Sequence, residues 1–410
     1  MRHRLFVLIF LSVLAVYCLG HADEQTTPEK DRPAWKDWVV FGGEGVGIGF
    51  FDPVTDRFVI PLIFKRAFTF ADNGLAAVML KNDKWGFINP AGKVVIPAQF
   101  EEAYNFNEYG LAQVCINGKW GLIDAQGKFV LPPKYHSYWS IGGFCHGLAQ
   151  VENKNGWGYC DPKGILVIPP QFEQAENFST YGLARVQKDG LWGYINTLGK
   201  VVIALQFEFA RDFSANGLAP VKKDELYGYI DATGTLVIAP QFLDAREFFD
   251  NGLAPVQTED GWGYINTQGD LVIAPQFESV GLEFSDNGLT SVQLDGLWGY
   301  INAQGQMIIP PHIGYGCPFG PNGLAVASGE NGDEGFIDIS GKFVIPPQFP
   351  PGTLGGFESN GLAAVDDHRG YPIACMDMQG VKILYWELIE DKDWVMKNRH
   401  GQIIWPETGR

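Results

Sequence analysis

A sequence motif, which we call the phrase, repeats along the chain and often ends in the residue pair Gly-Lys, as in Gly199-Lys200. The same pair occurs in loops that bind nucleotide phosphates. Such a loop has the pattern G-x-x-x-x-G-K-[ST]. Here five residues separate Gly193 from Gly199, and Val201 follows the lysine. The glycine-rich stretch 41–50 also lacks the spacing of a dinucleotide-binding loop. We therefore expect neither a phosphate-binding loop nor a cofactor.

One polar position of the phrase alternates between asparagine and aspartate. It is filled by Asn89, Asp124, Asp161, Asn196, Asp231, Asn266, Asn302, Asp338 and Asp377. A general acid, a general base or a metal-binding carboxylate would not tolerate an amide, which does not ionise near neutral pH. An acceptor that caps a turn tolerates both side chains. The position therefore predicts a structural role, and we expect no catalytic residue there.

Soft metal ligands come together once, where His136, Cys145 and His146 follow Cys115 by about one repeat. Their spacing is not that of a zinc site, so we expect no metal. The five cysteines after residue 22 are odd in number and share no pattern, which argues against a disulfide scaffold and favours isolated buried thiols. The sequence contains neither HExxH nor GxSxG, which weakens an enzymatic interpretation without excluding it.

The phrase that carries these residues is Trp-Gly-aromatic-Ile-Asn/Asp-x-x-Gly. Its doublets are Trp85-Gly86, Trp120-Gly121, Trp157-Gly158, Trp192-Gly193, Tyr227-Gly228, Trp262-Gly263 and Trp298-Gly299. From Gly86 to Gly335 the doublet glycines are spaced by 35, 37, 35, 35, 35, 36 and 36 residues. A Gly-Leu pair accompanies each of nine units. A short unit repeated in this way cannot bury both of its faces alone and must stack on its neighbours.

Each unit reads as a β-meander. A strand that begins at Gly-Leu ends in a hairpin dipeptide with positive φ, at Asn117-Gly118, Asn155-Gly156, Asp189-Gly190, Asp260-Gly261 and Asp295-Gly296. The Trp-Gly strand follows, then a type I turn between the Asx residue and the next glycine. The last strand has three apolar residues in succession, so we expect both of its faces to be covered. A short edge strand or an irregular loop completes the unit.

Aromatic residues and glycine have complementary roles in this scheme. The doublet glycine allows another backbone or ring to approach closely. The doublet tryptophan is expected in the core rather than on a sugar-binding surface, and Phe172, Phe178, Phe242 and Phe248 supply further buried area. Tryptophans outside the phrase are expected to be partly exposed: Trp35, Trp38, Trp139, Trp386 and Trp405.

The chain resembles the WG-repeat family, also described as KWG-type repeats, over about residues 40–380. The Gly-Lys form of the family core is present at Lys93, Lys128 and Lys200. The resemblance implies a bacterial, often exported, β-rich protein without a shared catalytic activity. The end copies depart from the pattern, which is typical of caps. We expect an all-β fold of stacked meanders, as an open β-solenoid or superhelix, with a β-propeller-like arrangement as the alternative.

The N-terminus indicates export. A basic start, an apolar run of about 15 residues and small residues before Asp23 are typical of a signal peptide. We expect a signal peptide over 1–22, a linker over 23–39, about nine repeats over 40–380 and a partial repeat or cap over 381–410. The net charge is −17, which argues against nucleic acid and anionic lipid as partners. We expect a periplasmic or extracellular protein without membrane insertion after cleavage.

The function that these observations favour is non-enzymatic binding of another protein along an extended repeat surface. The polar positions that vary between units would carry the recognition: Glu101, Glu173, Asp212, Arg246 and Glu278. Binding of an envelope glycan is the second hypothesis, and a hydrolase with an unrecognised site is the third.

Overall fold

The computed structural model describes residues 33–43, 46–135, 143–357, 361–366, 372–389 and 393–405. Within these residues the chain is all-β apart from one 3₁₀ turn, η3 (Ala34–Asp37). It divides into two compact units, Met1–Gln206 and Phe207–Arg410, which we call unit 1 and unit 2. The predicted signal peptide, 1–22, lies outside the described residues.

Unit 1 contains sheets β1–β3, β4–β7, β8–β11, β12–β14 and β15–β18. The strands are β1 (Val39–Gly43), β2 (Gly47–Asp52), β3 (Arg57–Phe64), β4 (Arg66–Ala67), β5 (Ala76–Met79), β6 (Trp85–Ile88), β7 (Val94–Phe100), β8 (Glu102–Phe106), β9 (Ala112–Ile116), β10 (Lys119–Ile123), β11 (Phe129–Tyr135), β12 (Ala149–Asn153), β13 (Gly156–Cys160), β14 (Leu166–Phe172), β15 (Gln174–Ala175), β16 (Leu183–Lys188), β17 (Leu191–Asn196) and β18 (Val201–Phe207), which ends at the boundary.

Unit 2 contains sheets β19–β22, β23–β26, β27–β30, β31–β33 and the six-stranded β34–β39. The strands are β19 (Phe209–Ala210), β20 (Leu218–Lys223), β21 (Leu226–Asp231), β22 (Leu236–Phe242), β23 (Asp244–Ala245), β24 (Ala254–Thr258), β25 (Gly261–Ile265), β26 (Leu271–Phe277), β27 (Ser279–Val280), β28 (Leu289–Leu294), β29 (Leu297–Asn302), β30 (Met307–Ile313), β31 (Ala325–Ser328), β32 (Glu334–Ile337), β33 (Phe343–Phe349), β34 (Leu354–Phe357), β35 (Leu362–Asp366), β36 (Pro372–Asp377), β37 (Lys382–Ile389), β38 (Asp393–Asn398) and β39 (Ile403–Trp405).

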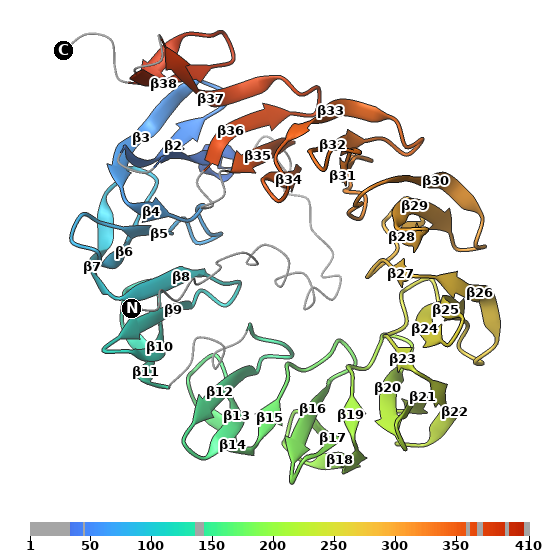
Figure 1. Cartoon of the computed structure of the whole chain (residues 1–410). Helices are drawn as coiled ribbons and strands as arrows, with labels where there is room; N and C mark the ends of the chain where they lie inside the picture. The colour runs from blue at the N-terminus through green and yellow to red at the C-terminus, as the bar shows by residue number, and fades with distance from the viewer. Residues whose placement is uncertain are drawn as a thin grey trace, which may run out of the picture. The chain divides into compact units, whose positions relative to one another are not determined.

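The all-β meander is confirmed, and within each unit it is the propeller-like alternative that applies rather than the solenoid. The complete repeat sheets are four antiparallel strands in sequence order, as in a propeller blade. Strand pairing in the three- and four-stranded sheets stays within about one repeat, and neighbouring sheets meet through side chains. Figure 1 shows the first strands of unit 2, β19, β23 and β27, on the opposite side of the row of sheets from the last strands, β22, β26 and β30. The sequence leaves the first strand undecided, and it is a strand of two residues in these sheets.

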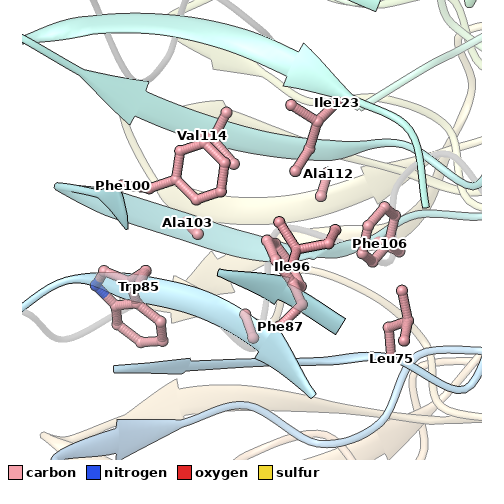
Figure 2. Packing of buried hydrophobic residues seen from close by; sticks show 11 residues of the cluster. Leu75, Trp85, Phe87, Ile96, Phe100, Ala103, Phe106, Ala112, Val114 and Ile123 are labelled. Atoms are coloured by element: carbon pink, nitrogen blue, oxygen red, sulfur yellow. The ribbon is translucent and has the colours of Figure 1, made fainter. Parts of the chain in front are cut away.

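Side chains from two sheets form each core. In Figure 2, Trp85, Phe87 and Ile96 come from sheet β4–β7, and they pack against Ala103 and Phe106 of sheet β8–β11. The same positions recur along the chain, and the predicted burial of Phe172, Phe178, Phe242 and Phe248 is confirmed. Burial of apolar area between sheets therefore holds neighbouring repeats together.

The turn that follows the Trp-Gly strand also joins neighbouring sheets. Asn266 Oδ1 accepts hydrogen bonds from the amides of Gln268 and Asp270, at 3.0 and 2.9 Å. Gly269 has φ +86°, and a Cβ there would lie 3.2 Å from the Ile238 side chain of the preceding sheet. Glycine is required at this position both by its dihedral angle and by the close packing. Every described member of the Asn/Asp position accepts amide hydrogen bonds in this way, so the predicted turn-capping role is confirmed.

Two kinds of hairpin connect the second and third strands. Asn117-Gly118, Asp189-Gly190 and Asp295-Gly296 have positive φ at both residues, as predicted. At Asp260-Gly261 only the glycine has positive φ, and Gly261 already pairs with Thr258 in the ladder. A Cβ on Gly261 would lie 2.7 Å from the carbonyl oxygen of Phe277. The predicted turn there, and the equivalent one at Asn155-Gly156, is therefore displaced by one residue.

The residues just before the first sheet also pack on the fold. Trp35 of η3 and Trp38 each place a ring 5.9 Å from the ring of Phe70. Both tryptophans are half-buried, as expected for tryptophans outside the phrase. The side chains of Trp139, Trp386 and Trp405 lie outside what the structure describes.

Candidate functional site

The doublet tryptophans belong to the fold rather than to an exposed ring surface. Four are buried, namely Trp85, Trp120, Trp192 and Trp262, while Trp157, Tyr227 and Trp298 are half-buried. Trp85 stacks on Phe68 at 5.5 Å, and the Arg246 guanidinium lies 4.4 Å from the centre of the Trp262 ring. The predicted core role is therefore confirmed for the buried members. Their ring faces are occupied by protein and cannot receive a sugar.

The doublet glycines are needed because the last strand bulges against them. Trp262 pairs with Phe277 and Tyr264 pairs with Ile273, which leaves extra residues on the last strand between the two pairs. A Cβ on Gly263 would lie 2.6 Å from the Ile273 carbonyl oxygen. The other members meet the same backbone at comparably short distances: Gly86, Gly121, Gly158, Gly193, Gly228 and Gly299. The predicted close approach of another backbone is confirmed.

Buried tyrosine hydroxyls connect some of the neighbouring sheets. The Tyr229 hydroxyl donates to the carbonyl oxygen of Arg246 at 2.8 Å, and the Tyr300 hydroxyl donates to that of Cys317 at 2.7 Å. Burial raises the pKa of Tyr229 well above its ordinary value. These aromatic residues serve packing and hydrogen bonding between sheets.

The His/Cys group does not form a metal centre in the described part of the chain. His136 lies outside the described residues. His146 Nε2 lies 2.8 Å from the carbonyl oxygen of Ser179, a contact that fits a loop hydrogen bond. Among the described residues no group of three or more His, Cys, Asp and Glu side chains could hold a metal ion. Cys115 and Cys160 have free, buried thiols, and burial raises their pKa to about 11 and about 12.

Three of the polar positions that vary between repeats and were expected to carry recognition share one structural role. Glu101 accepts a hydrogen bond from the Gly118 amide at 2.8 Å, and Glu278 accepts one from the Gly296 amide at 3.0 Å. Glu173 accepts hydrogen bonds from the Asp189 and Gly190 amides, both at 3.1 Å. These carboxylates cap the hairpins with two positive φ values. The sequence does not show this role, because the partners lie 16 to 18 residues apart.

Arg246, another of those positions, connects neighbouring sheets of unit 2. Its Nη1 donates to the carbonyl oxygen of Val280 at 3.3 Å while its guanidinium covers Trp262. In the preceding sheet Arg211 forms an ion pair with Asp244 at 3.2 Å. Burial is the main cause that lowers the pKa of Arg246 from its ordinary value. This arginine acts inside the structure and is not a freely exposed contact.

The last strands carry an apolar surface that the sequence interpretation missed. The apolar triplet was expected to be covered on both faces, but only its third residue is buried. In β26, Leu271 is 55% exposed and Val272 44% exposed, whereas Ile273 is 4% exposed. The bulge and the prolines leave this strand at the edge of the sheet. The exposed residues, which we call the last-strand pairs, are Val94-Val95, Leu166-Val167, Val201-Val202, Leu236-Val237, Leu271-Val272 and Met307-Ile308.

One terminal copy replaces the ring with a carboxylate. Glu334 stands at the tryptophan position of β32 and is buried. Its two carboxylate oxygens accept hydrogen bonds from the amides of Gly352 and Leu354, at 2.8 and 3.1 Å. The buried charge is therefore bound by backbone amides of the following segment.

The chain contains no described helix with the length and apolar character that a membrane crossing requires.

Comparison with known proteins identifies the repeat. The sequence profile described as WG containing repeat matches nine consecutive segments: 48–85, 85–120, 120–156, 157–192, 192–227, 227–261, 262–298, 298–331 and 335–366. No curated protein gives a significant match. A crystal structure of the eukaryotic initiation factor is similar at 12% identity and a TM-score of 0.48, covering 74% of this chain and 94% of that one.

Two further solved structures show weaker similarity. BamB from Moraxella catarrhalis is 11% identical with a TM-score of 0.36, covering 72% of this chain and 94% of that one. The computationally designed Ika8 protein is 9% identical with a TM-score of 0.36, covering 65% and 93%. The profile match extends over most of the sequence and rests on the Trp-Gly doublets described above. The chain therefore belongs to the WG containing repeat family.

Proposed function

We propose that this chain is a non-enzymatic scaffold that binds another protein through the last-strand pairs of its repeat sheets. The observation that carries the proposal is the exposure of two adjacent aliphatic side chains at the same position of successive sheets. Single exposed apolar residues are ordinary on protein surfaces, whereas exposed apolar residues that gather on one surface mark interaction sites. Repeats that each present the same pair suit a partner that spans several of them.

The recurring residues support a scaffold rather than an active site. The doublets pack the core, the Asn/Asp position caps turns, and three of the expected recognition carboxylates cap hairpins. A protein partner is favoured over a glycan because the buried doublet rings are not free to stack on sugar, and the exposed pairs are aliphatic. We further propose that the protein is bacterial and exported, which rests on the apolar N-terminal segment before Asp23.

Affinity capture from an extract of the source organism tests the scaffold. The bait is the full chain, beside a variant in which every last-strand pair is replaced by serine. The matched control is Leu198→Ser, which removes an 81% exposed apolar side chain from a turn. We expect the partners captured by the unaltered chain and by the control to be lost with the serine variant. Capture unchanged by the serine variant would contradict the proposal.

Two further measurements test the remaining parts. Protein recovered from the source organism should begin near Asp23, and recovery from the cytosol with Met1 retained would contradict export.

A broad panel of hydrolase substrates should show no turnover. A measurable turnover abolished by one substitution would overturn the non-enzymatic assignment.

A further inference from the structure

The last-strand pairs have similar exposure in the two units, which allows a direct comparison of their surroundings. In unit 1, Val94-Val95 are 40% and 44% exposed, and Val201-Val202 are 41% and 44% exposed. In unit 2, Leu271-Val272 are 55% and 44% exposed, and Met307-Ile308 are 37% and 43% exposed. The apolar contribution of each pair is therefore similar, and any difference in partner must come from neighbouring groups.

Charge differs at the start of these strands. Lys93 precedes Val94 and Lys200 precedes Val201, whereas Asp270 precedes Leu271 and Gln306 precedes Met307. Asp270 is exposed, and its carboxylate accepts a hydrogen bond from the Asn266 side-chain amide at 3.2 Å. A lysine beside an edge strand discourages other chains from pairing with that edge. Unit 2 lacks this lysine at β26 and β30.

Charge also differs at the other end of the strands, where the hairpins lie. In unit 1 the hairpins carry Lys81, Lys84 and Lys188 together with Asp83 and Asp189. In sheet β23–β26 the hairpin carries Glu259 and Asp260, both exposed. In sheet β27–β30 it carries the exposed Asp295. The residue before each of these two strands and the hairpins of both sheets are therefore without lysine, and the charged residues of these hairpins are all acidic.

This difference extends through a continuous stretch of the chain. Residues 247–341 contain 13 Asp and Glu and no Lys or Arg, a net charge of −13. The nearest basic residue before the stretch, Arg246, already donates to Val280 and covers Trp262. The acidic groups of sheets β23–β26 and β27–β30 are thus left without basic neighbours in sequence. Uncompensated charge of one sign favours a partner of the opposite sign.

We propose that the last strands β26 and β30 form a docking surface for a cationic segment of another protein, in which lysine or arginine accompanies aliphatic side chains. The aliphatic side chains contact Leu271-Val272 and Met307-Ile308, and the basic groups face Asp270 and the acidic hairpins. This inference rests on the proposed function and adds the location and charge of the partner. The corresponding strands of unit 1, β7 and β18, do not share this preference.

Peptide binding to the full chain tests the inference. The probe is a short labelled peptide in which lysine alternates with valine, compared with a glutamate–valine peptide and with oligolysine. We expect the lysine–valine peptide to bind at least about tenfold more tightly than either comparison peptide at low salt. Because exposed charges are screened beyond about 10 Å at 0.1 M salt, we expect its affinity to fall about tenfold at high salt.

Matched variants locate the surface. Serine replacement of Leu271, Val272, Met307 and Ile308 should weaken binding about tenfold, because it removes the apolar contacts. Serine replacement of Val94, Val95, Val201 and Val202 should change affinity less than about twofold, although it removes pairs of similar exposure. Asp270→Lys introduces the residue of unit 1 and should weaken binding about threefold. Thermal unfolding of each variant verifies that it remains folded.

The outcomes separate this inference from the proposed function. Equal affinity for the glutamate–valine peptide, or equal loss from the two serine variants, overturns the cationic docking surface and leaves the scaffold proposal intact. Equal affinity for oligolysine shows a non-specific charge effect and also overturns the inference. Cellular partners that are captured independently of every last-strand pair overturn the proposed function itself.

Discussion

Unit 1 and unit 2 are built from similar antiparallel sheets but differ in net charge. Residues 1–206 contain 19 basic and 19 acidic residues, for a net charge of 0. Residues 207–410 contain 11 basic and 28 acidic residues, for a net charge of 11 − 28 = −17, which is the net charge of the whole chain. The comparison shows that the repeat determines packing while leaving surface charge free to diverge. Recognition should therefore be sought at positions that the sheet does not use.

The largest effect is expected from removing the doublet ring. Trp192→Ala in unit 1 and Trp262→Ala in unit 2 should each reduce the free energy of unfolding by roughly 3–5 kcal/mol, because both rings are buried. Chemical denaturation of both variants measures this loss. If one substitution were tolerated while the other was severe, the two units would not share one packing scheme.

A smaller loss is expected at the doublet glycine. Gly193→Ala and Gly263→Ala each place a Cβ 2.6 Å from the carbonyl oxygen of the last strand. The strand must shift, at a cost of about 1–3 kcal/mol in the free energy of unfolding. Gly110→Ala provides a comparison, since a Cβ there has no neighbour within 4 Å and only its φ of +69° causes strain. A milder effect at Gly193 and Gly263 than at Gly110 would contradict the bulge-contact explanation.

The hairpin carboxylates should contribute less. Glu173→Ala and Glu278→Ala each remove an acceptor of backbone amides and should lower the free energy of unfolding by about 0.5–1.5 kcal/mol. The control is Leu243→Ala at the equivalent position of a sheet with the other hairpin, expected within about 0.5 kcal/mol of the unaltered chain. Thermal melts compare the three variants, and equal losses would argue against capping.

The same contact makes a prediction for pH. The Gly118 amide lowers the pKa of Glu101 in the folded protein, so folding favours the carboxylate. The contribution of this group is present above its ordinary pKa and is lost as the pH falls through the lowered value. In Glu101→Gln the stability should therefore decline less on acidification, which melts recorded across acidic pH can detect. A Gln variant with an unchanged acid profile would remove this assignment.

The smallest effect concerns thiol reactivity. Burial raises the pKa of Cys160 in unit 1 to about 12, and it also raises the pKa of the half-buried Cys317 in unit 2. Only the thiolate is nucleophilic, so both should alkylate slowly at neutral pH and faster as the pH rises. Cys317 should react before Cys160 because it is more exposed. Mass spectrometry of the alkylated native protein tests this order, and rapid modification of Cys160 would show that its sheet opens.

Much of the fold could be predicted because many recurrent residues satisfy requirements of the backbone within a few residues of themselves. The Asn196 turn and the Asp189-Gly190 hairpin follow from dihedral preferences that act within a few residues. The turn predicted at Asp260-Gly261 is displaced by one residue. Gly261 is a glycine for a different reason, because a Cβ there would clash with the carbonyl oxygen of Phe277 in another strand. A dipeptide alone does not separate these two reasons for glycine.

The candidate site was less predictable, for a physical reason. Three successive apolar residues such as Leu271-Val272-Ile273 normally indicate a strand covered on both faces. In this protein the bulge and the neighbouring prolines place the strand at an edge, where the first two side chains stay exposed. The hairpin role of Glu278 depends on a partner in another strand. The uneven charge, in contrast, is present in the sequence and requires only that the two halves be counted separately.

Hydrogen–deuterium exchange of the full chain with the lysine–valine peptide tests the central claim most directly, because it reports both units in one sample. Matched segments are β26 and β30 in unit 2 and β7 and β18 in unit 1. We predict slower amide exchange on peptide addition in β26, β30 and the hairpin at Glu259-Asp260, with unchanged exchange in β7 and β18. Equal protection of all four strands, or protection confined to β7 and β18, would contradict the claim that a shared scaffold carries a cation-selective surface in unit 2.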